Sequence, residues 1–420
     1  MATFSTWTRR VRNSGVGSRP CPINLEAAFA WGNYRSLMSS IYLDHAATTP
    51  VRDEVVAAMT PYLTARFGNP SSIHRWGQEA AAALEEARDR LASAIGARAS
   101  EVRFVRGGTE SDNLAIIGGV RALARAGDCP VLMASAIEHS AVLQPSQWLA
   151  ARGEAEFRRV PVSPEGRLDF DAVSGDLDRR PSLLSVMWAN NETGVLLPVD
   201  EAVAWAAHSG TVVHTDASQA LGKVAIDLEG LGIHLLTATG HKIGGPRGTG
   251  LLFVRDGVEI EPLMFGGGQE RTLRPGTEDV AGAIGLTEAI CLAVQELDRC
   301  PRHLAAMRDR LEARLVRAIP HLRVNCEEAR RVPHILSLGV PDITNPAAFL
   351  MALDLEGIAA SSGSACQSGA ASKSHVISAL YGPNDPFTTV RFSVGPSTTE
   401  DQVEQAATLI ERVWKRLSLT

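Results

Sequence analysis

The sequence is poor in lysine and in long apolar runs. Of its 41 basic residues only four are lysine, at positions 223, 242, 373 and 415. An enzyme that needs an amine nucleophile therefore has four candidates, because a guanidinium stays protonated and cannot attack a carbonyl. No apolar run approaches the roughly 20 residues that span a bilayer. We therefore expect no membrane-embedded segment.

The sequence also has no closely spaced pair of cysteines and no large net charge. Its six cysteines are scattered, at positions 21, 129, 291, 300, 326 and 366, without a Cys-x-x-Cys pair. This argues against a zinc site or a disulfide framework and favours a reducing compartment, so we expect a cytoplasmic protein. The net charge of −6 gives no reason to expect a nucleic acid or an anionic membrane as partner.

The composition is that of a globular protein, apart from the first 40 residues. The chain has 420 residues, 45% hydrophobic and 21% charged, enough for one large or two moderate domains. Residues 1–40 carry five arginines against a single acid, Glu26. Such an Arg- and Ser-rich, acid-poor start is typical of an organellar transit peptide. We favour a disordered extension, or a start upstream of Met38, and sequencing the mature N-terminus distinguishes the readings.

From residue 41 onward, short apolar runs alternate with segments of helical periodicity. The runs expected to be strands cover 41–43, 102–105, 131–133, 183–187, 211–214, 233–236 and 251–254, and helical spacing covers 51–64, 77–95, 114–126 and 279–318. This alternation predicts an α/β fold with a mostly parallel sheet and ligands at the strand carboxyl ends. We place a large domain at 41–290, of which 41–60 can pack with a smaller α+β domain at 291–420. The smaller domain has expected strands near 322–326 and 334–340 and helices near 346–356 and 400–417.

Chemically useful side chains follow several of these runs. Lys242 lies between an apolar run and a glycine cluster, and an amine there forms an imine with an aldehyde if burial and a neighbouring positive charge lower its pKa from about 10.4. Asp216 suits a protonated pyridine nitrogen, and His139 offers a flat ring for stacking on an aromatic cofactor. Taken one at a time, both residues have an ordinary alternative explanation: a helix cap for Asp216 and a half-buried histidine without a catalytic role for His139.

A phosphate seat is expected beside these residues. Gly-Gly-Thr at 107–109 joins a strand to a helix, where free N–H groups and the helix dipole face an anion, although such a sequence is often only a turn and N-cap. Gly108, Thr109, Thr239 and His241 offer phosphate donors, and Asn191 and Gln219 suit a phenolic oxygen. Together these groups are the set that pyridoxal 5′-phosphate requires.

Many motifs, in one order along the chain, resemble those of cysteine desulfurases. They are Tyr-Leu-Asp-His-Ala-Ala-Thr-Thr-Pro (42–50), Phe-Gly-Asn-Pro-Ser-Ser (67–72), Gly-Gly-Thr-Glu-Ser-Asp-Asn-Leu-Ala (107–115), Glu-His-Ser-Ala-Val (138–142), Asn-Asn-Glu-Thr-Gly (190–194), Asp-Ala-Ser-Gln (216–219), Thr-Gly-His-Lys (239–242), Arg-Pro-Gly-Thr (274–277), Ser-Ser-Gly-Ser-Ala-Cys (361–366) and Val-Arg-Phe-Ser-Val-Gly (390–395). The resemblance covers about 41–417 and implies a dimeric, pyridoxal-phosphate-dependent enzyme of fold type I. Such enzymes convert L-cysteine to L-alanine and keep the sulfur as an enzyme persulfide.

The resemblance also implies a role for each motif residue. Lys242 would bind the cofactor covalently, and His139 would stack on its ring and assist proton transfer. Asp216 would pair with the pyridinium, with Gln219 and Asn191 near the phenolate. The phosphate would be held by Gly108, Thr109, Thr239 and His241, and by Thr277 of the other subunit. Arg391 would bind the substrate carboxylate, for which a planar bidentate donor is suited.

Cys366 would be the nucleophile that receives the sulfur. It lies in a run of small residues, 359–372, which indicates a mobile loop that lets a thiolate reach a buried substrate and then an acceptor. The acceptor is open: an iron–sulfur scaffold, a tRNA-thiolation enzyme, a DNA-sulfur pathway or another carrier. Apart from transient ligation of an iron–sulfur cluster by Cys366, we expect no metal site.

Three features depart from the family pattern. Arg106 stands where a small hydroxyl residue is more usual, so it either adds charge near the phosphate or points to solvent. Pro396 replaces an arginine found in some members, and the sequence stops soon after Leu417, which leaves the acceptor open. A selenocysteine lyase, or another lyase or aminotransferase on the same scaffold, is the alternative function, and an inactive homologue acting as a binding module is a further one.

Overall fold

The computed structural model describes residues 40–124, 129–177, 180–362 and 373–418. Residues Ile41–Thr420 belong to one compact unit. Two predictions from the sequence concern segments outside the described residues: the extension up to residue 39 and the part of the loop that carries Cys366.

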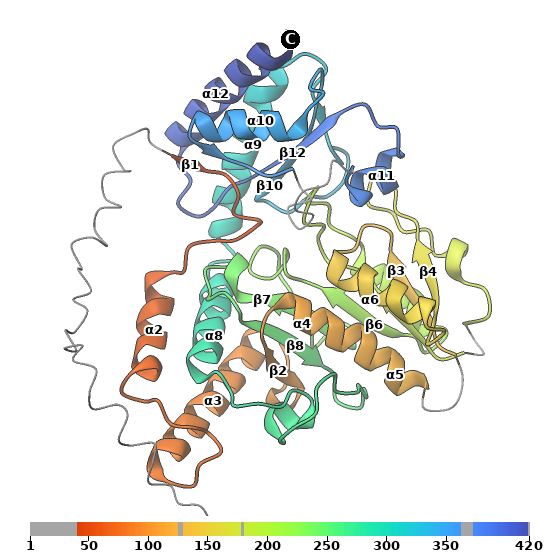
Figure 1. The fold of residues 1–420 in the computed structure, drawn as a ribbon, viewed down its shortest axis with the longest axis vertical. Helices are drawn as coiled ribbons and strands as arrows, with labels where there is room; N and C mark the ends of the chain where they lie inside the picture. Colours follow the sequence, from red (N-terminus) through yellow and green to blue (C-terminus); the bar gives the residue numbers. More distant parts are fainter. Residues whose placement is uncertain (1–39, 125–128, 178–179, 363–372, 419–420) are drawn as a thin grey trace, which may run out of the picture. The chain divides into compact units, whose positions relative to one another are not determined.

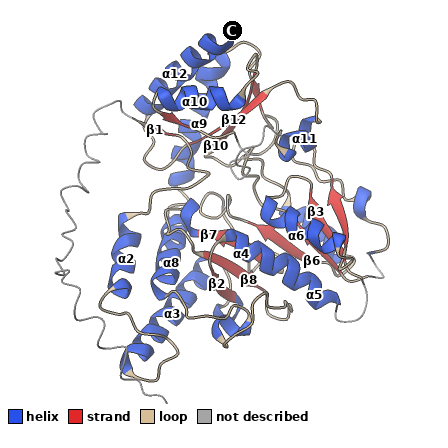
Figure 2. Cartoon of the chain, in the orientation of Figure 1, coloured by secondary structure: helices blue, strands red, loops and turns tan. Residues whose placement is uncertain are grey.

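A seven-stranded sheet stands at the centre of the fold (Figures 1 and 2). Its strands, in spatial order, are β2 (Val102–Val105), β8 (Gly250–Val254), β7 (Leu235–Thr239), β6 (Val212–Asp216), β5 (Ser182–Ser185), β3 (Val131–Ser135) and β4 (Glu156–Val160). Strands β7, β6, β5, β3 and β4 pair in parallel, whereas β8 is antiparallel to both β7 and β2. This confirms the predicted α/β fold with a mostly parallel, mixed sheet. Strand β4 had not been predicted.

Helices cover both faces of this sheet, as its continuously apolar strands require. They are α2 (Asp53–Leu63), α3 (Arg75–Ala94), α4 (Gly108–Asn113), α5 (Gly119–Leu123), α6 (Ser140–Ala151), α7 (Val199–Ala207) and α8 (Val280–Gln295). Because successive strand residues point to opposite faces, Leu132 packs with residues of α5 and α6, whereas Met133 packs with those of α3, α7 and α8. Both side chains are fully buried.

The C-terminal part of the chain builds a second, three-stranded antiparallel sheet. Strand β10 (Ile335–Val340) lies between β9 (Arg323–Val324) and β12 (Thr388–Ser393). Helices α9 (Cys300–Ala318), α10 (Pro346–Leu355) and α12 (Glu400–Ser418) contribute to its apolar core, which also includes Ile41 and Leu43. Strand β1 (Ile41–Tyr42) pairs with β11 (Ile358–Ala359), and α11 (His375–Tyr381) precedes β12. The division into domains at residue 290 stays a prediction.

The helix expected over 279–318 is two helices. Helices α8 and α9 meet at a 77° bend, and Pro301 lies in the first turn of α9, where a missing N–H costs nothing. No single described helix is long and apolar enough to cross a membrane; only this bent pair reaches that length together.

A close contact joins the loop after β1 to the loop after β12, and it yields a prediction on stability. A Cβ atom added to Gly395 would lie 2.2 Å from Cε1 of the buried His45 ring. We expect Gly395→Ala to lower the free energy of unfolding by about 1–3 kcal/mol, because the packed ring has to move. Gly230→Ala is the matched control, since its Cβ would meet no atom within 4 Å. Equal urea midpoints for the two variants would contradict this account.

Candidate cofactor site

The predicted site residues come together at one edge of the large sheet. Asp216 ends β6 and Thr239 ends β7, while Lys242 lies in the helical turn Gly240–Lys242 that follows. His139 is the N-cap of α6, just after β3. Strand β2 runs in the same direction as β7, because both are antiparallel to β8. The glycines after β2 therefore reach the same edge as the parallel strands.

Lys242, His139 and Asp216 act on one another electrostatically. The pKa of His139 is lowered chiefly by burial and then by the charge of Lys242, while the Asp216 carboxylate opposes the change. The Nδ1 atom of His139 accepts a hydrogen bond from the backbone N–H of Ala141 at 3.1 Å. The neutral ring therefore carries its proton on Nε2. An amine, a neutral imidazole and a carboxylate thus share one site.

The predicted phosphate seat is a cradle that two glycines leave open. Gly107 has a φ of 125°, and α4, which begins at Gly108, has no side-chain cap and continues through a π-helical turn into α5. A Cβ atom on Gly108 would lie 3.4 Å from Ser218 Oγ and 3.8 Å from Thr239 Cβ. Backbone donors and hydroxyls therefore border a space that a side chain would fill. Ser218 had not been singled out, although it belongs to the Asp-Ala-Ser-Gln motif.

The other predicted phosphate ligands differ in their surroundings. Thr239 donates to the carbonyl oxygen of Thr249 at 3.3 Å, and Thr109 is exposed at the start of α4. The Nδ1 atom of His241 lies 3.2 Å from Thr48 Oγ1, and burial, followed by the charges of Lys242 and Arg247, lowers the pKa of His241 to about 4. Thr277 is exposed. Its predicted contact with another subunit stays a prediction.

The two predicted phenolate ligands are held by the chain itself. Gln219 donates from Nε2 to the carbonyl oxygen of Ala46 at 2.9 Å, and its Oε1 accepts from His334 at 3.1 Å. One N–H of this amide is left for a ligand. Asn191 is half-buried. Its buried neighbour Asn190 accepts from the backbone N–H groups of Glu192 and Thr193 and donates to the carbonyl oxygen of Ile137 in the loop after β3.

Arg391 is fixed in orientation although it is almost completely buried. It is 2% exposed, and its two terminal nitrogens donate to the carbonyl oxygen of Asn191 at 2.7 Å and to Oδ1 of Asp44 at 2.8 Å. Its Nε has no hydrogen-bond partner among the described residues. Since an unpaired buried donor is costly, this N–H is suited to an anionic ligand. Asp44 had not been predicted.

Two buried carboxyls that the sequence did not reveal lie near Asp216. Burial raises the pKa of Glu138 to about 8, and burial together with the charge of Asp216 raises the pKa of Asp112 well above its usual value. One oxygen of each has no hydrogen-bond partner among the described residues. Burial therefore favours the neutral form of both carboxyls.

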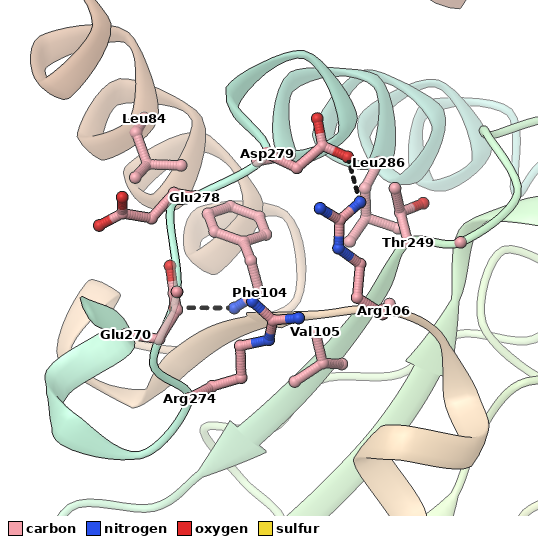
Figure 3. A pocket seen from close by; sticks show the side chains of 14 residues that line it. Leu84, Phe104, Val105, Arg106, Thr249, Glu270, Arg274, Glu278, Asp279 and Leu286 are labelled. Atoms are coloured by element: carbon pink, nitrogen blue, oxygen red, sulfur yellow. Dashed lines mark hydrogen bonds and ion pairs between the residues drawn. The ribbon is translucent and has the colours of Figure 1, made fainter. Parts of the chain in front are cut away.

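Arg106 forms an ion pair with an acid, and its side chain is 51% exposed to solvent. Its Nη1 donates to Asp279 Oδ2 at 2.7 Å, and Asp279 caps α8 through Gly282 N–H. Figure 3 shows this pair beside Arg274, which lines the same small cavity of about 30 Å³. Glu110 connects the two arginines, because it accepts from the backbone of Arg106 and from Nε of Arg274. Arg106 therefore ties the loop after β2 to the start of α8.

These groups fit pyridoxal 5′-phosphate. The cradle at Gly108 suits a phosphate, Asp216 a protonated ring nitrogen, and Lys242 an aldehyde. The neutral His139 beside them suits stacking and proton transfer. Cys366, the predicted nucleophile, lies outside the described residues.

The sequence has close relatives among proteins of known activity. The family model for aminotransferase class V matches residues 41–406. A cysteine desulfurase IscS of Dictyoglomus turgidum is 40% identical over 90% of this chain and 95% of its own length. The cysteine desulfurase NifS of Azotobacter vinelandii is 41% identical over 88% of this chain and 91% of its own length.

Solved structures agree with these relatives. A NifS-like protein superposes with a TM-score of 0.82 at 31% identity, over 90% of this chain and 100% of the other. DndA from Streptomyces lividans superposes with a TM-score of 0.69 at 38% identity, over 84% of this chain and 99% of the other. The chain therefore belongs to the aminotransferase class V family and, within it, to the cysteine desulfurases.

Proposed function

We propose that this protein is a pyridoxal-phosphate-dependent cysteine desulfurase that converts L-cysteine to L-alanine and passes the sulfur through Cys366 to an acceptor. The observation that carries the proposal is the grouping of Lys242, His139 and Asp216 beside an open glycine cradle. The relatives named cysteine desulfurase, and the solved structure of SspA in complex with cysteine at 28% identity, support it. No described residue favours a selenocysteine lyase instead.

Each residue has a part that its position suits. When bound, the cofactor supplies an aldehyde that takes up the substrate amino group and a ring that withdraws electrons from the α-carbon. Lys242 and the neutral His139 hold and move protons at the substrate, and Asp216 keeps the ring nitrogen protonated. Arg391 binds the substrate carboxylate. Cys366 attacks the substrate sulfur, so that an S–S bond forms as the C–S bond breaks and L-alanine leaves.

The remaining assignments extend this proposal. We place Gly108, Thr109, Thr239 and His241 at the phosphate, with Thr277 from the second subunit of a homodimer, and Asn191 and Gln219 near the phenolic oxygen. Exposed apolar side chains support a dimer, since Phe67, Ile73 and Phe265 are 70%, 93% and 89% exposed in one chain. The domain boundary near 290, the cytoplasmic location and an iron–sulfur scaffold or another carrier as acceptor belong to the same proposal.

Product analysis tests the function. With L-cysteine and a thiol reductant, the protein should release alanine and sulfide in equal amounts, and without a reductant it should retain one sulfur per active site as persulfide. Pyruvate and ammonia in place of alanine would instead indicate β-elimination, and the desulfurase proposal would be wrong. Selenocysteine, supplied in parallel, tests the alternative lyase.

The carboxylate role of Arg391 can be tested by Arg391→Lys. The variant keeps a positive charge but loses the fork that now binds Asn191 and Asp44. A charge-assisted hydrogen bond contributes about 2 kcal/mol, so we expect KM for L-cysteine to rise about thirtyfold while cofactor content stays unchanged. Arg416→Lys, in an exposed pair with Glu356, is the control. An unchanged KM in Arg391→Lys would remove Arg391 from the substrate site.

A further inference from the structure

A second lysine lies directly behind Lys242. Lys223, in the turn after Gln219, is half-buried, and its Nζ donates a hydrogen bond to the backbone carbonyl oxygen of Lys242 at 3.0 Å. Both lysines line one cavity of about 340 Å³. Two of the four lysines of the chain therefore lie together, although lysine is rare in the sequence.

No carboxylate forms a salt bridge with Lys223 among the described residues. Three acids line the same cavity, Asp53, Glu54 and Glu296. Glu296 is held by both terminal nitrogens of Arg52, at 2.9 and 2.6 Å, and Glu54 lies 3.9 Å from Arg52 Nε. Burial lowers the pKa of Lys223 to about 8, Cys300 opposes this, and the charge of Lys242 adds to it. At neutral pH Lys223 is therefore mainly an ammonium whose field is not cancelled by a paired acid.

The histidines that border the cavity do not add charge. Burial lowers the pKa of His45 to about 4 and that of His334 well below its usual value, with Lys223 as the next contributor in both. His334 donates from Nε2 to Gln219, so its buried Nδ1 is an acceptor, and this atom has no hydrogen-bond partner among the described residues. Lys223 therefore contributes positive charge at this side of Lys242, where the other cation that lines the cavity, Arg52, is paired with Glu296.

Other groups face Lys242 from the surrounding elements. They are Asp112 on α4, His139 at the start of α6, His241 in the same turn and His334 before β10. Burial favours the neutral form of the three histidines and of Asp112. Asp216, beyond His139, is the nearby carboxylate. Lys223 is thus the neighbouring cation that an amine nucleophile requires.

We propose that Lys223 is a positioning residue for Lys242: its ammonium holds the Lys242 backbone and keeps the Lys242 amine unprotonated until the cofactor aldehyde arrives. The charge of Lys242 is among the causes that lower the pKa of Lys223, and because such a coupling is reciprocal, the two amines disfavour double protonation. Lys223 keeps the proton because the Lys242 carbonyl accepts its hydrogen bond. The inference rests on the proposed function only in assigning Lys242 to the cofactor.

The rarity of lysine makes a direct test possible. The cofactor-free protein is pulse-labelled with an amine-acetylating reagent between about pH 6 and pH 10, the range in which amines titrate in proteins. Peptide mass spectrometry then gives a labelling midpoint for each lysine in the wild type, Lys223→Met and Lys223→Arg. In the wild type, Lys242 should have a lower midpoint than Lys415, which lies on the surface of α12.

Removal of the charge should raise the Lys242 midpoint. In Lys223→Met we expect a rise of about one pH unit, a roughly tenfold loss of free amine at neutral pH, with cofactor capture slowed by the same factor. Lys223→Arg should keep the wild-type midpoint, and Lys415 should label alike in all three proteins. An unchanged Lys242 midpoint in Lys223→Met overturns the proposal.

Two further outcomes keep the test decisive. If Lys223→Met does not fold, a wild-type Lys242 midpoint equal to that of Lys415 overturns the proposal without any variant. If the protein releases no alanine from cysteine while the midpoints shift as expected, the proposed function fails and the role of Lys223 stands. Labelling therefore separates the two claims.

Discussion

Replacing Lys242 with alanine should abolish covalent cofactor binding and lower the turnover of L-cysteine by at least about a thousandfold, as removal of a nucleophile in covalent catalysis does. The physical reason is the position of this amine beside the neutral His139 and the Asp216 carboxylate. No other lysine shares that position. Lys223 binds the Lys242 backbone, Lys373 donates to the carbonyl oxygens of Pro383 and Asp385, and Lys415 pairs with Glu411. Absorbance of the purified protein and mass spectrometry after borohydride reduction give the measurement.

The fold of this variant should be intact, so loss of activity is interpretable. Lys242 is half-buried at a cavity, and its truncation leaves the backbone contact from Lys223 in place. Lys415→Ala is the matched control and should keep cofactor and activity. Full turnover by Lys242→Ala, or attachment of the cofactor to another lysine after borohydride reduction, would show that Lys242 is not the residue that binds the cofactor.

Cys366→Ala should retain the cofactor and its absorbance but form no persulfide. Sulfur transfer requires a thiolate, and the described alternatives are poorly suited to provide one. Burial raises the pKa of Cys291, Cys300 and Cys326, which favours their thiol form at neutral pH. Cys129 is exposed, but it precedes β3 and so lies at the opposite end of that strand from the site. We expect release of alanine to fall at least about a hundredfold, because attack on the substrate sulfur is lost.

Cys300→Ala is the sharpest control for this experiment. Cys300 lines the cavity behind Lys242 and is the described cysteine that interacts with Lys223. Persulfide is measured by alkylation and peptide mass spectrometry after a single addition of L-cysteine. Persulfide on Cys300, or normal desulfuration by Cys366→Ala, would refute the assignment of the nucleophile.

Local sequence patterns were sufficient to predict most strands of the sheet and to propose several site residues. An apolar run followed by polar residues predicts a strand and its carboxyl end, and β6 ending at Asp216 and β7 ending at Thr239 follow this rule. The rule fails where a segment lacks the pattern: β4 carries charged residues within Glu156–Val160 and was missed. The break between α8 and α9 was missed because both segments keep helical spacing, although Pro301, which cannot continue a helix through its own N–H, marks the start of the second one.

The sequence by itself determined the alternation of strands and helices and the family, and it led to the prediction of Lys242, His139 and Asp216 as site residues, because these depend on short-range pattern. The tertiary structure decided which distant segments meet: Asp44 and Arg391 pair across 347 positions, and the antiparallel β8 aligns the Gly107 loop with the parallel strands. Burial changed the acidity of side chains as well, since it raises the pKa of both Asp112 and Glu138. The tertiary structure also decided the hydrogen bond from Lys223 to the backbone of Lys242, because it joins two loops and no local sequence pattern predicts it.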